Sequence, residues 1–127
     1  MKSKSIFDLQ KKYNHQLGYC MSDCPPGWYE TVDNMIQKLI LIPTFNLDDI
    51  AQIKSKFAGL RTYIDRGNLV TDAQWKQINQ IIDDAELQCR EICEDCGKSP
   101  AKVFGTGWIF RLCDICITEH KEKHQNL

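Results

Sequence analysis

Apolar residues recur at helical spacing in three parts of this chain. The stripes cover residues 28–42, 46–58 and 71–92, and each predicts an amphipathic helix because residues three and four apart share one face. Thr71 and Gln74 form a capping-box pattern at the start of the third stripe. Other residues that favour helix starts or ends flank the stripes: Pro26, Pro43, Asn46 and Gly59.

Strand patterns occupy the remaining apolar segments. Residues 60–64 alternate apolar and polar side chains, and residues 102–112 hold two short apolar runs around Gly105-Thr106-Gly107, which predicts a hairpin. Residues 114–124 form a short polar helix in this interpretation. We therefore expect an α+β fold in which about three main helices pack on a small antiparallel sheet that joins strand 60–64 to the hairpin. The expected core anchors are Trp28, Trp75 and Trp108.

The chain length favours one compact domain. The 127 residues are enough for a single core. Residues 1–24 are an N-terminal lead-in with one weak helical stripe (Ile6, Leu9, Tyr13 and Leu17), and residues 25–127 form the domain. A zinc ribbon is expected over residues 89–120 within this domain.

Composition and charge limit the class of protein. Hydrophobic residues make up 43% and charged residues 26%, and the net charge is −1, so no global basic field attracts nucleic acid. No apolar run reaches the length of a membrane span, and no secretory pattern follows the basic N-terminus. We expect a cytoplasmic protein of a bacterial or infected host cell. The odd number of cysteines, 7, argues against a complete disulfide framework.

Four cysteines carry the strongest chemical signal. Cys93, Cys96, Cys113 and Cys116 form two Cys-x-x-Cys pairs, a spacing typical of one structural, tetrahedral Zn²⁺ per chain. His120 and His124 offer alternative ligands if one replaces a cysteine. A second metal at Cys20 and Cys24, with Cys89 and His15, is a weaker alternative, because Cys89 lies on the core stripe of the third helix, where cysteine acts as a small hydrophobe.

The segment from Lys54 to Arg66 gathers positive charge around Gly59. It predicts an anion or partner contact, whose candidate residues are Lys54, Lys56, Arg61, Tyr63 and Arg66. A helix C-terminus complemented by lysines is the plainer alternative. The acidic residues of the third stripe, continuing through Glu94 and Asp95, are expected to be exposed to solvent. No catalytic motif assembles around any of these residues, so the chain is not expected to be an enzyme.

Three motifs in order resemble those of a family of small, mostly uncharacterised phage and bacterial proteins. They are Cys24-Pro-Pro-Gly-Trp28, then Lys54-x-Lys56-Phe57-x-Gly59-Leu60-Arg61-x-Tyr63, then the knuckle that opens at Cys93. The family pattern has Gly-Asp where this chain has Pro25-Pro26, an aromatic residue where it has Thr62, Glu and Gly at positions 55 and 58, and often histidine at position 116. The resemblance implies a defined structural or binding element at residues 54–63 and supplies no activity.

These patterns together favour a small zinc-stabilised binding or accessory protein of phage or mobile-element origin. Its expected partner is a host or phage protein, including components of host defence. The alternative is nucleotide or nucleic-acid binding through the segment Lys54–Arg66.

Overall fold

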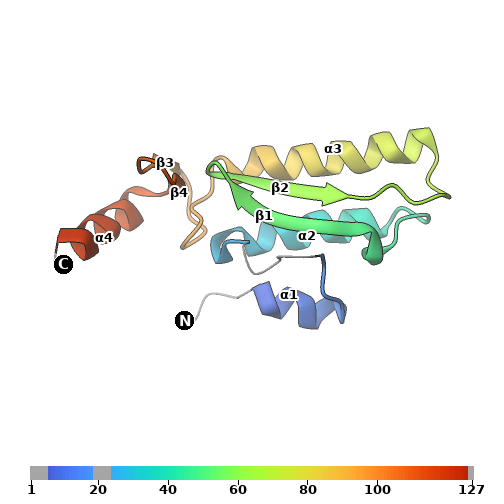
Figure 1. Ribbon diagram of the computed structural model, residues 1–127, viewed down its shortest axis with the longest axis horizontal. Helices are drawn as coiled ribbons and strands as arrows, with labels where there is room; N and C mark the ends of the chain where they lie inside the picture. Colours follow the sequence, from blue (N-terminus) through green and yellow to red (C-terminus); the bar gives the residue numbers. More distant parts are fainter. Residues whose placement is uncertain (1–5, 19–23, 126–127) are drawn as a thin grey trace.

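The computed structural model describes residues 6–18 and 24–125, and it confirms the α+β class. Figure 1 shows the helices and the long β-hairpin running side by side, with the C-terminal elements at one end. In chain order, the elements are α1 (Ile6–Tyr13), η2 (Pro26–Trp28), α2 (Tyr29–Ile40), η3 (Leu47–Asp49), β1 (Ile50–Lys56), β2 (Gly59–Ile64), α3 (Asp72–Cys89), β3 (Lys102–Phe104), β4 (Phe110–Leu112) and α4 (Asp114–Gln125).

The main core lies between α2, α3 and the inner face of the β1–β2 hairpin. Trp28, Leu39, Ile53 and Leu60 are fully buried there, and Ile78 joins them from α3. The α3 stripe starts as the sequence predicts, since Thr71 and Gln74 make both hydrogen bonds of a capping box. Apolar burial on this scale is the main force that holds the helices to the hairpin.

The segment 46–58, expected to be a helix, is instead a short 3-10 turn followed by strand β1. Asn46 does act as a cap, because its side chain accepts a hydrogen bond from the Asp48 N–H. From Ile50 onward the backbone pairs with β2 in antiparallel register. The β-branched Ile50 and Ile53 fit either pattern, and pairing with β2 gives the strand hydrogen bonds that decide between them.

Phe57 and Ala58 form the two-residue loop of this hairpin, so Gly59 opens β2 and does not end a helix. Both loop residues have positive φ, 53° and 60°, as a type I′ turn requires. Phenylalanine is a costly residue in this conformation. Its ring stays 71% exposed, whereas Ala58 is fully buried.

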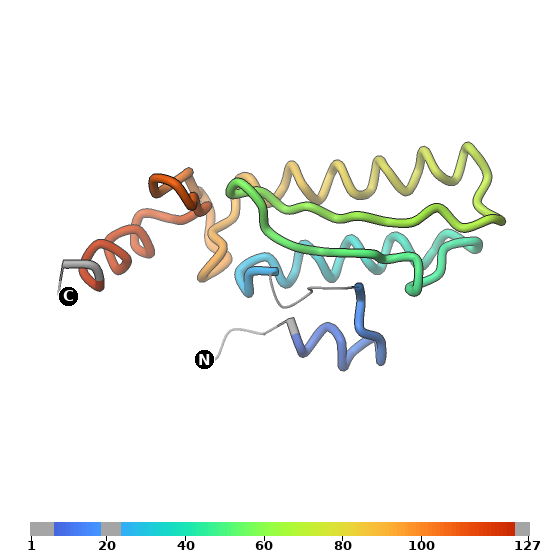
Figure 2. The backbone as a smooth tube through the Cα atoms, viewed as in Figure 1, coloured from blue at the N-terminus to red at the C-terminus, as the bar shows by residue number. Residues whose placement is uncertain are grey.

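The expected single sheet is also wrong, because β2 pairs with β1 alone and β3 pairs with β4 alone. The β3–β4 hairpin is a separate ribbon beside the β1–β2 turn, as the tube in Figure 2 shows. It carries its own small apolar cluster. Trp108 is therefore not a core anchor. It lies in the ribbon turn and is 69% exposed, whereas Trp28 is buried and Trp75 partly so.

Helix α1 packs on α2 through buried and charged contacts. Leu9 is fully buried in the main core. Asp33 of α2 accepts hydrogen bonds from Lys12, at 2.7 Å, and from the Tyr13 hydroxyl. Burial opposes ionisation of Asp33, but these hydrogen bonds outweigh it and hold the pKa of the carboxyl below its usual value near 3.8. Burial, together with the hydrogen bond to Asp33, raises the pKa of Tyr13.

The helices are short or polar. Within residues 6–18 and 24–125, none combines the length and apolar character needed to cross a membrane.

Candidate metal centre and hairpin cleft

The four paired cysteines come together at one point. Cys93 and Cys96 lie in the turn that follows α3, Cys113 follows β4, and Cys116 lies in the first turn of α4. The first pair is held in a tight loop, since the Gly97 N–H donates to the Cys93 carbonyl at 3.0 Å. Gly97 has φ of +80°, a conformation that glycine adopts without strain.

The sulfurs of these cysteines have the geometry of a metal site. All four lie within 4.8 Å of one another, and the Cys96 and Cys113 sulfurs are 3.6 Å apart. Four thiolates around one tetrahedral Zn²⁺, at a metal–sulfur distance of about 2.3 Å, lie roughly 3.8 Å apart. The donor set therefore fits a metal ion with four protein ligands, leaving no position for a substrate.

The thiols perturb one another's ionisation in opposite directions. The Cys116 backbone N–H lowers the pKa of the Cys113 thiol to about 7. Burial and the neighbouring sulfurs raise the pKa of Cys116. A cysteine thiol must lose its proton before it binds a metal, because the thiolate is the ligand. A divalent cation at the centre would offset the repulsion between the four charges.

The alternative ligands lie elsewhere or outside the described residues. The His120 ring contacts Phe104 edge-on and Phe110 at a tilt, and His120 lies 3.8 Å from Asp95. It is not one of the four clustered groups. The side chain of His124 and all of Cys20 fall outside the described residues.

Cys24 and Cys89, the remaining cysteines among the described residues, belong to no second group of potential metal ligands. Cys24 and Cys89 are buried, and burial raises the pKa of Cys24 to about 12. Over residues 6–18 and 24–125, the four-cysteine group is the only set of three or more His, Cys, Asp or Glu residues placed to hold a metal.

The Pro-Pro-Gly-Trp segment before α2 rests directly on the first knuckle. The Gly27 N–H donates to the Glu94 carbonyl at 2.6 Å, and the Trp28 indole N–H donates to the Ile92 carbonyl at 2.9 Å. A Cβ on Gly27 would lie 2.0 Å from the Cys93 carbonyl oxygen. Only glycine permits this close approach. The Cys24-Pro-Pro-Gly-Trp28 motif and the knuckle that opens at Cys93 therefore contact each other directly in the fold.

Glu94 joins the metal centre to the β1–β2 hairpin, and the expectation that it is exposed is wrong. Its side chain is 5% exposed. It accepts hydrogen bonds from the Ser55 hydroxyl, at 3.2 Å, and from the Arg111 backbone N–H. Burial raises the pKa of Glu94, and these two hydrogen bonds oppose the shift. Asp95, the next residue, is exposed as expected.

Arg111 makes a second link between the two hairpins. Its guanidinium donates to the Ala58 carbonyl at 3.1 Å. This contact reaches from β4 of the ribbon to the β1–β2 turn. The turn that holds Phe57 in its strained conformation is thus tied to the strand that leads into Cys113.

Four of the five basic-segment candidates lie together. Lys54 and Arg61 face each other across the hairpin, so they share its outer face with Lys56 and Tyr63. The Lys54 ammonium lies 5.7 Å from the centre of the Tyr63 ring.

Arg66 lies apart from this group. Its guanidinium donates to Val70 and Asp72 at 2.9 Å and 2.7 Å and covers the Trp75 ring. Its contacts tie the loop after β2 to the start of α3, and it does not share the outer face of the hairpin.

A cleft separates the tips of the two hairpins. We call it the hairpin cleft. It has a volume of about 460 Å³, and a smaller hollow of about 150 Å³ lies between Lys56, Phe57 and Trp108. The residues that line the hairpin cleft are Pro25, Lys54, Ser55, Lys56, Glu94, Trp108 and Phe110.

Sequence reasoning missed the aromatic part of the hairpin cleft. The sequence pattern predicts Phe57 on a helix and Trp108 in the core. A turn built on Phe57-Ala58 gives no glycine or asparagine signal. The Gly105-Thr106-Gly107 turn beside Trp108 was the one available hint that its side chain lies at a solvent-facing tip.

A search of protein-family models, of curated proteins and of solved structures found no match to this chain. The resemblance to phage and bacterial proteins therefore stays an expectation.

Proposed function

We propose that this chain is a zinc-stabilised binding module in which the metal is structural. Zn²⁺ is the ion that a four-cysteine, tetrahedral site of this size suits best. The single observation that carries the proposal is the convergence of the four sulfurs within 4.8 Å. A metal with four protein ligands has no open position for water, which argues against catalysis.

The proposed role of the zinc is to hold the ribbon against the β1–β2 hairpin and so to shape the hairpin cleft. Glu94 and Arg111 provide the links, because each lies between ligand cysteines in the chain and contacts the hairpin. Binding of the metal then fixes the relative positions of Phe57 and Trp108, the exposed aromatic residues at the two tips.

Metal content and amide hydrogen exchange test this role. Elemental analysis should find about one zinc per chain. Chelation should raise exchange in the ribbon and in the β1–β2 turn, and should leave α2 protected because its core is separate. Cys96→Ser should reproduce the effect, whereas Cys89→Ala, a change to a buried thiol outside the cluster, should keep the zinc. A metal-free protein with full protection of both hairpins would refute the proposal.

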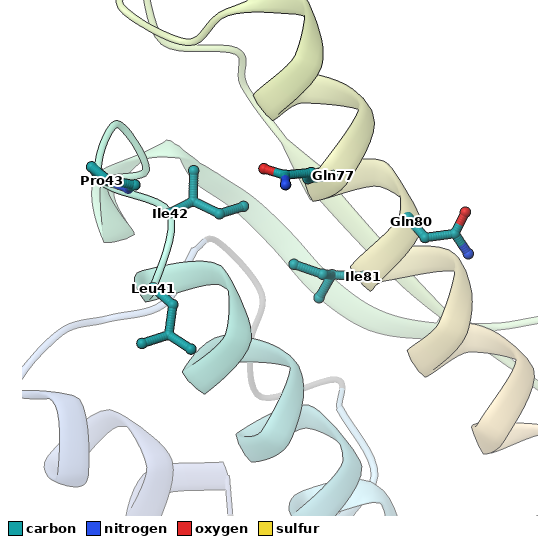
Figure 3. Close-up of a pocket in the computed structure, with 6 residues that line it drawn as sticks. All are labelled: Leu41, Ile42, Pro43, Gln77, Gln80 and Ile81. Carbon is teal, nitrogen blue, oxygen red and sulfur yellow. The ribbon is translucent and has the colours of Figure 1, made fainter.

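A protein partner is a second candidate, supported by an apolar groove on the helical side. The groove has a volume of about 550 Å³ and lies between the end of α2 and helix α3. Figure 3 shows Ile42 and Ile81 on its two sides, with Leu41 projecting from the end of α2. Leu41 is 80% exposed, and exposed apolar residues around a groove are typical of protein contacts.

Quantitative affinity capture tests this second candidate. The resemblance to phage and bacterial proteins makes a bacterial lysate the natural source of partners. A partner that uses the groove should be retained by the native chain and by Leu69→Glu, and lost with Leu41→Glu. The two leucines are equally exposed, at 81% and 80%, so the comparison isolates position. Equal recovery with both variants would rule out the groove.

A further inference from the structure

We propose that the hairpin cleft binds single-stranded nucleic acid, with bases stacked on Trp108 and Phe57 and phosphates held by Lys54 and Lys56. This inference rests on the proposed function, because the metal-bound ribbon supplies one wall of the cleft. It adds a ligand class to that function, chosen because it suits the shape and chemistry of the tips of the β1–β2 and β3–β4 hairpins.

The aromatic side chains form the first part of the argument. Trp108 and Phe57 are 69% and 71% exposed, and both line the small hollow between the tips. Phe110 extends the aromatic surface, with its ring centre 6.5 Å from that of Trp108. Exposed aromatic rings such as those of Trp108 and Phe57 are platforms on which unstacked bases pack, and every base has a suitable face.

The backbone at Phe57 adds independent support. A phenylalanine with φ of 53° is strained, and an asparagine or glycine would form this turn at lower cost. The strained side chain is not used in the core, since the ring points to solvent. Strain kept at an exposed aromatic residue points to a use for that side chain in binding.

The charges select an anionic ligand. Lys54 and Lys56 line the cleft, and Arg61 lies opposite Lys54 on the same outer face. Glu94 is the one acidic residue among the lining residues. It is buried and hydrogen-bonded on both oxygens.

Lysine beside exposed aromatic rings favours nucleic acid over protein as the ligand. Lysine is depleted at the centres of protein interfaces. Proteins that bind single-stranded nucleic acid, in contrast, usually combine basic side chains with aromatic rings on which bases stack. A duplex keeps its bases stacked, so it cannot use the rings.

Fluorescence anisotropy with a labelled oligothymidine strand of about 12 nucleotides, within the site sizes of small single-strand binders, is the direct test. We expect the zinc-loaded full chain to bind it more tightly than a duplex of the same length. Trp108→Ala should weaken binding roughly 5- to 150-fold, the loss of one stacked base. Phe7→Ala, which removes an aromatic side chain of similar exposure from α1, should leave binding unchanged.

Two further variants separate binding from folding. Phe57→Asn suits the positive φ of the turn and removes the ring, so it should weaken oligonucleotide binding without lowering thermal stability. Replacing Lys54 and Lys56 together by alanine should reduce the slope of log affinity against log salt by about 1.4, as expected for two lost phosphate contacts on a single strand. Lys76→Ala, on the exposed surface of α3, is the control.

The assignment would be overturned by no binding to the strand by zinc-loaded protein, by binding that is independent of salt, or by equal binding by Trp108→Ala. Tighter binding to an acidic peptide or to duplex would overturn it as well. In each case a zinc-loaded protein with coupled hairpins would leave the binding-module proposal standing. Absence of zinc from the purified chain would instead refute that earlier proposal.

Discussion

Replacing Gly27 by alanine should separate helix α2 from the metal centre. The added Cβ would lie 2.0 Å from the Cys93 carbonyl oxygen and 2.5 Å from that of Glu94. Ordinary carbon–oxygen contacts are about 3.3 Å, so the backbones must separate by roughly 1 Å. Neither carbonyl can turn aside freely, because each accepts a backbone hydrogen bond in the native structure.

The expected cost of this substitution follows from three contributions. Overpacking of a tight site costs roughly 1–3 kcal/mol. Weakening the hydrogen bonds from Gly27 and from the Trp28 indole adds about 0.5–1.5 kcal/mol each. The total is on the order of 2–6 kcal/mol, a large part of the roughly 5–15 kcal/mol that stabilises a typical domain. At roughly 3–5 °C per kcal/mol for a chain of this length, the thermal midpoint should fall by about 6–30 °C.

Thermal and urea unfolding of the zinc-loaded protein, followed by circular dichroism, would measure the effect. Gly67→Ala is a matched control. Gly67 is not in the left-handed region, and its added Cβ would meet the Asp49 carboxylate at 3.2 Å, a side chain that can move. Chelator competition should also show weaker zinc binding by Gly27→Ala. If Gly27→Ala unfolds within about 1 kcal/mol of the native chain, below the expected cost of roughly 2–6 kcal/mol, the contact between α2 and the knuckle is not as we describe it.

Three smaller changes test other contacts. Thr71→Ala should destabilise the chain by about 1 kcal/mol in urea unfolding, since it removes the hydroxyl that caps Gln74, and an unchanged midpoint would argue against the cap. Asp33→Asn should lower the free energy of unfolding at neutral pH, because a carboxyl with a lowered pKa stabilises the fold only while it is ionised. The difference from the native chain should shrink as the pH falls below about 4, and a difference that does not change with pH would contradict this. Arg111→Met should raise amide exchange in the Phe57-Ala58 turn, since it removes the bond to the Ala58 carbonyl, and unaltered exchange there would show that the turn holds without the link.

Much of the fold could be predicted where the sequence pattern fits only one type of secondary structure. The α3 stripe, its Thr71 cap and the strand before it lie within a few residues of their predicted bounds. The two Cys-x-x-Cys pairs also meet, because their spacing constrains the local turns. In these places local preference and tertiary packing agree.

Strand β1 could not be predicted, because Ile50, Ile53 and Phe57 also recur at helical spacing. Periodicity alone does not separate a short apolar strand from a helix. The deciding information was the partner strand and a turn formed by residues that rarely adopt positive φ. The burial of Glu94 depends in the same way on a distant partner, Ser55, that no local pattern indicates.

The small size of the ribbon's apolar cluster has a consequence for the life of the protein in a cell. Apart from cysteines, the buried residues of that cluster are Leu112 and Ile117. So little apolar surface cannot offset the conformational entropy of ordering this segment. If the four cysteines hold zinc as we propose, metal binding supplies the difference, and its contribution rises with the ratio of free zinc to the dissociation constant. Zinc scarcity would therefore expose the segment around Trp108 to proteases while the main core stays folded, so that metal supply sets the lifetime of the intact chain.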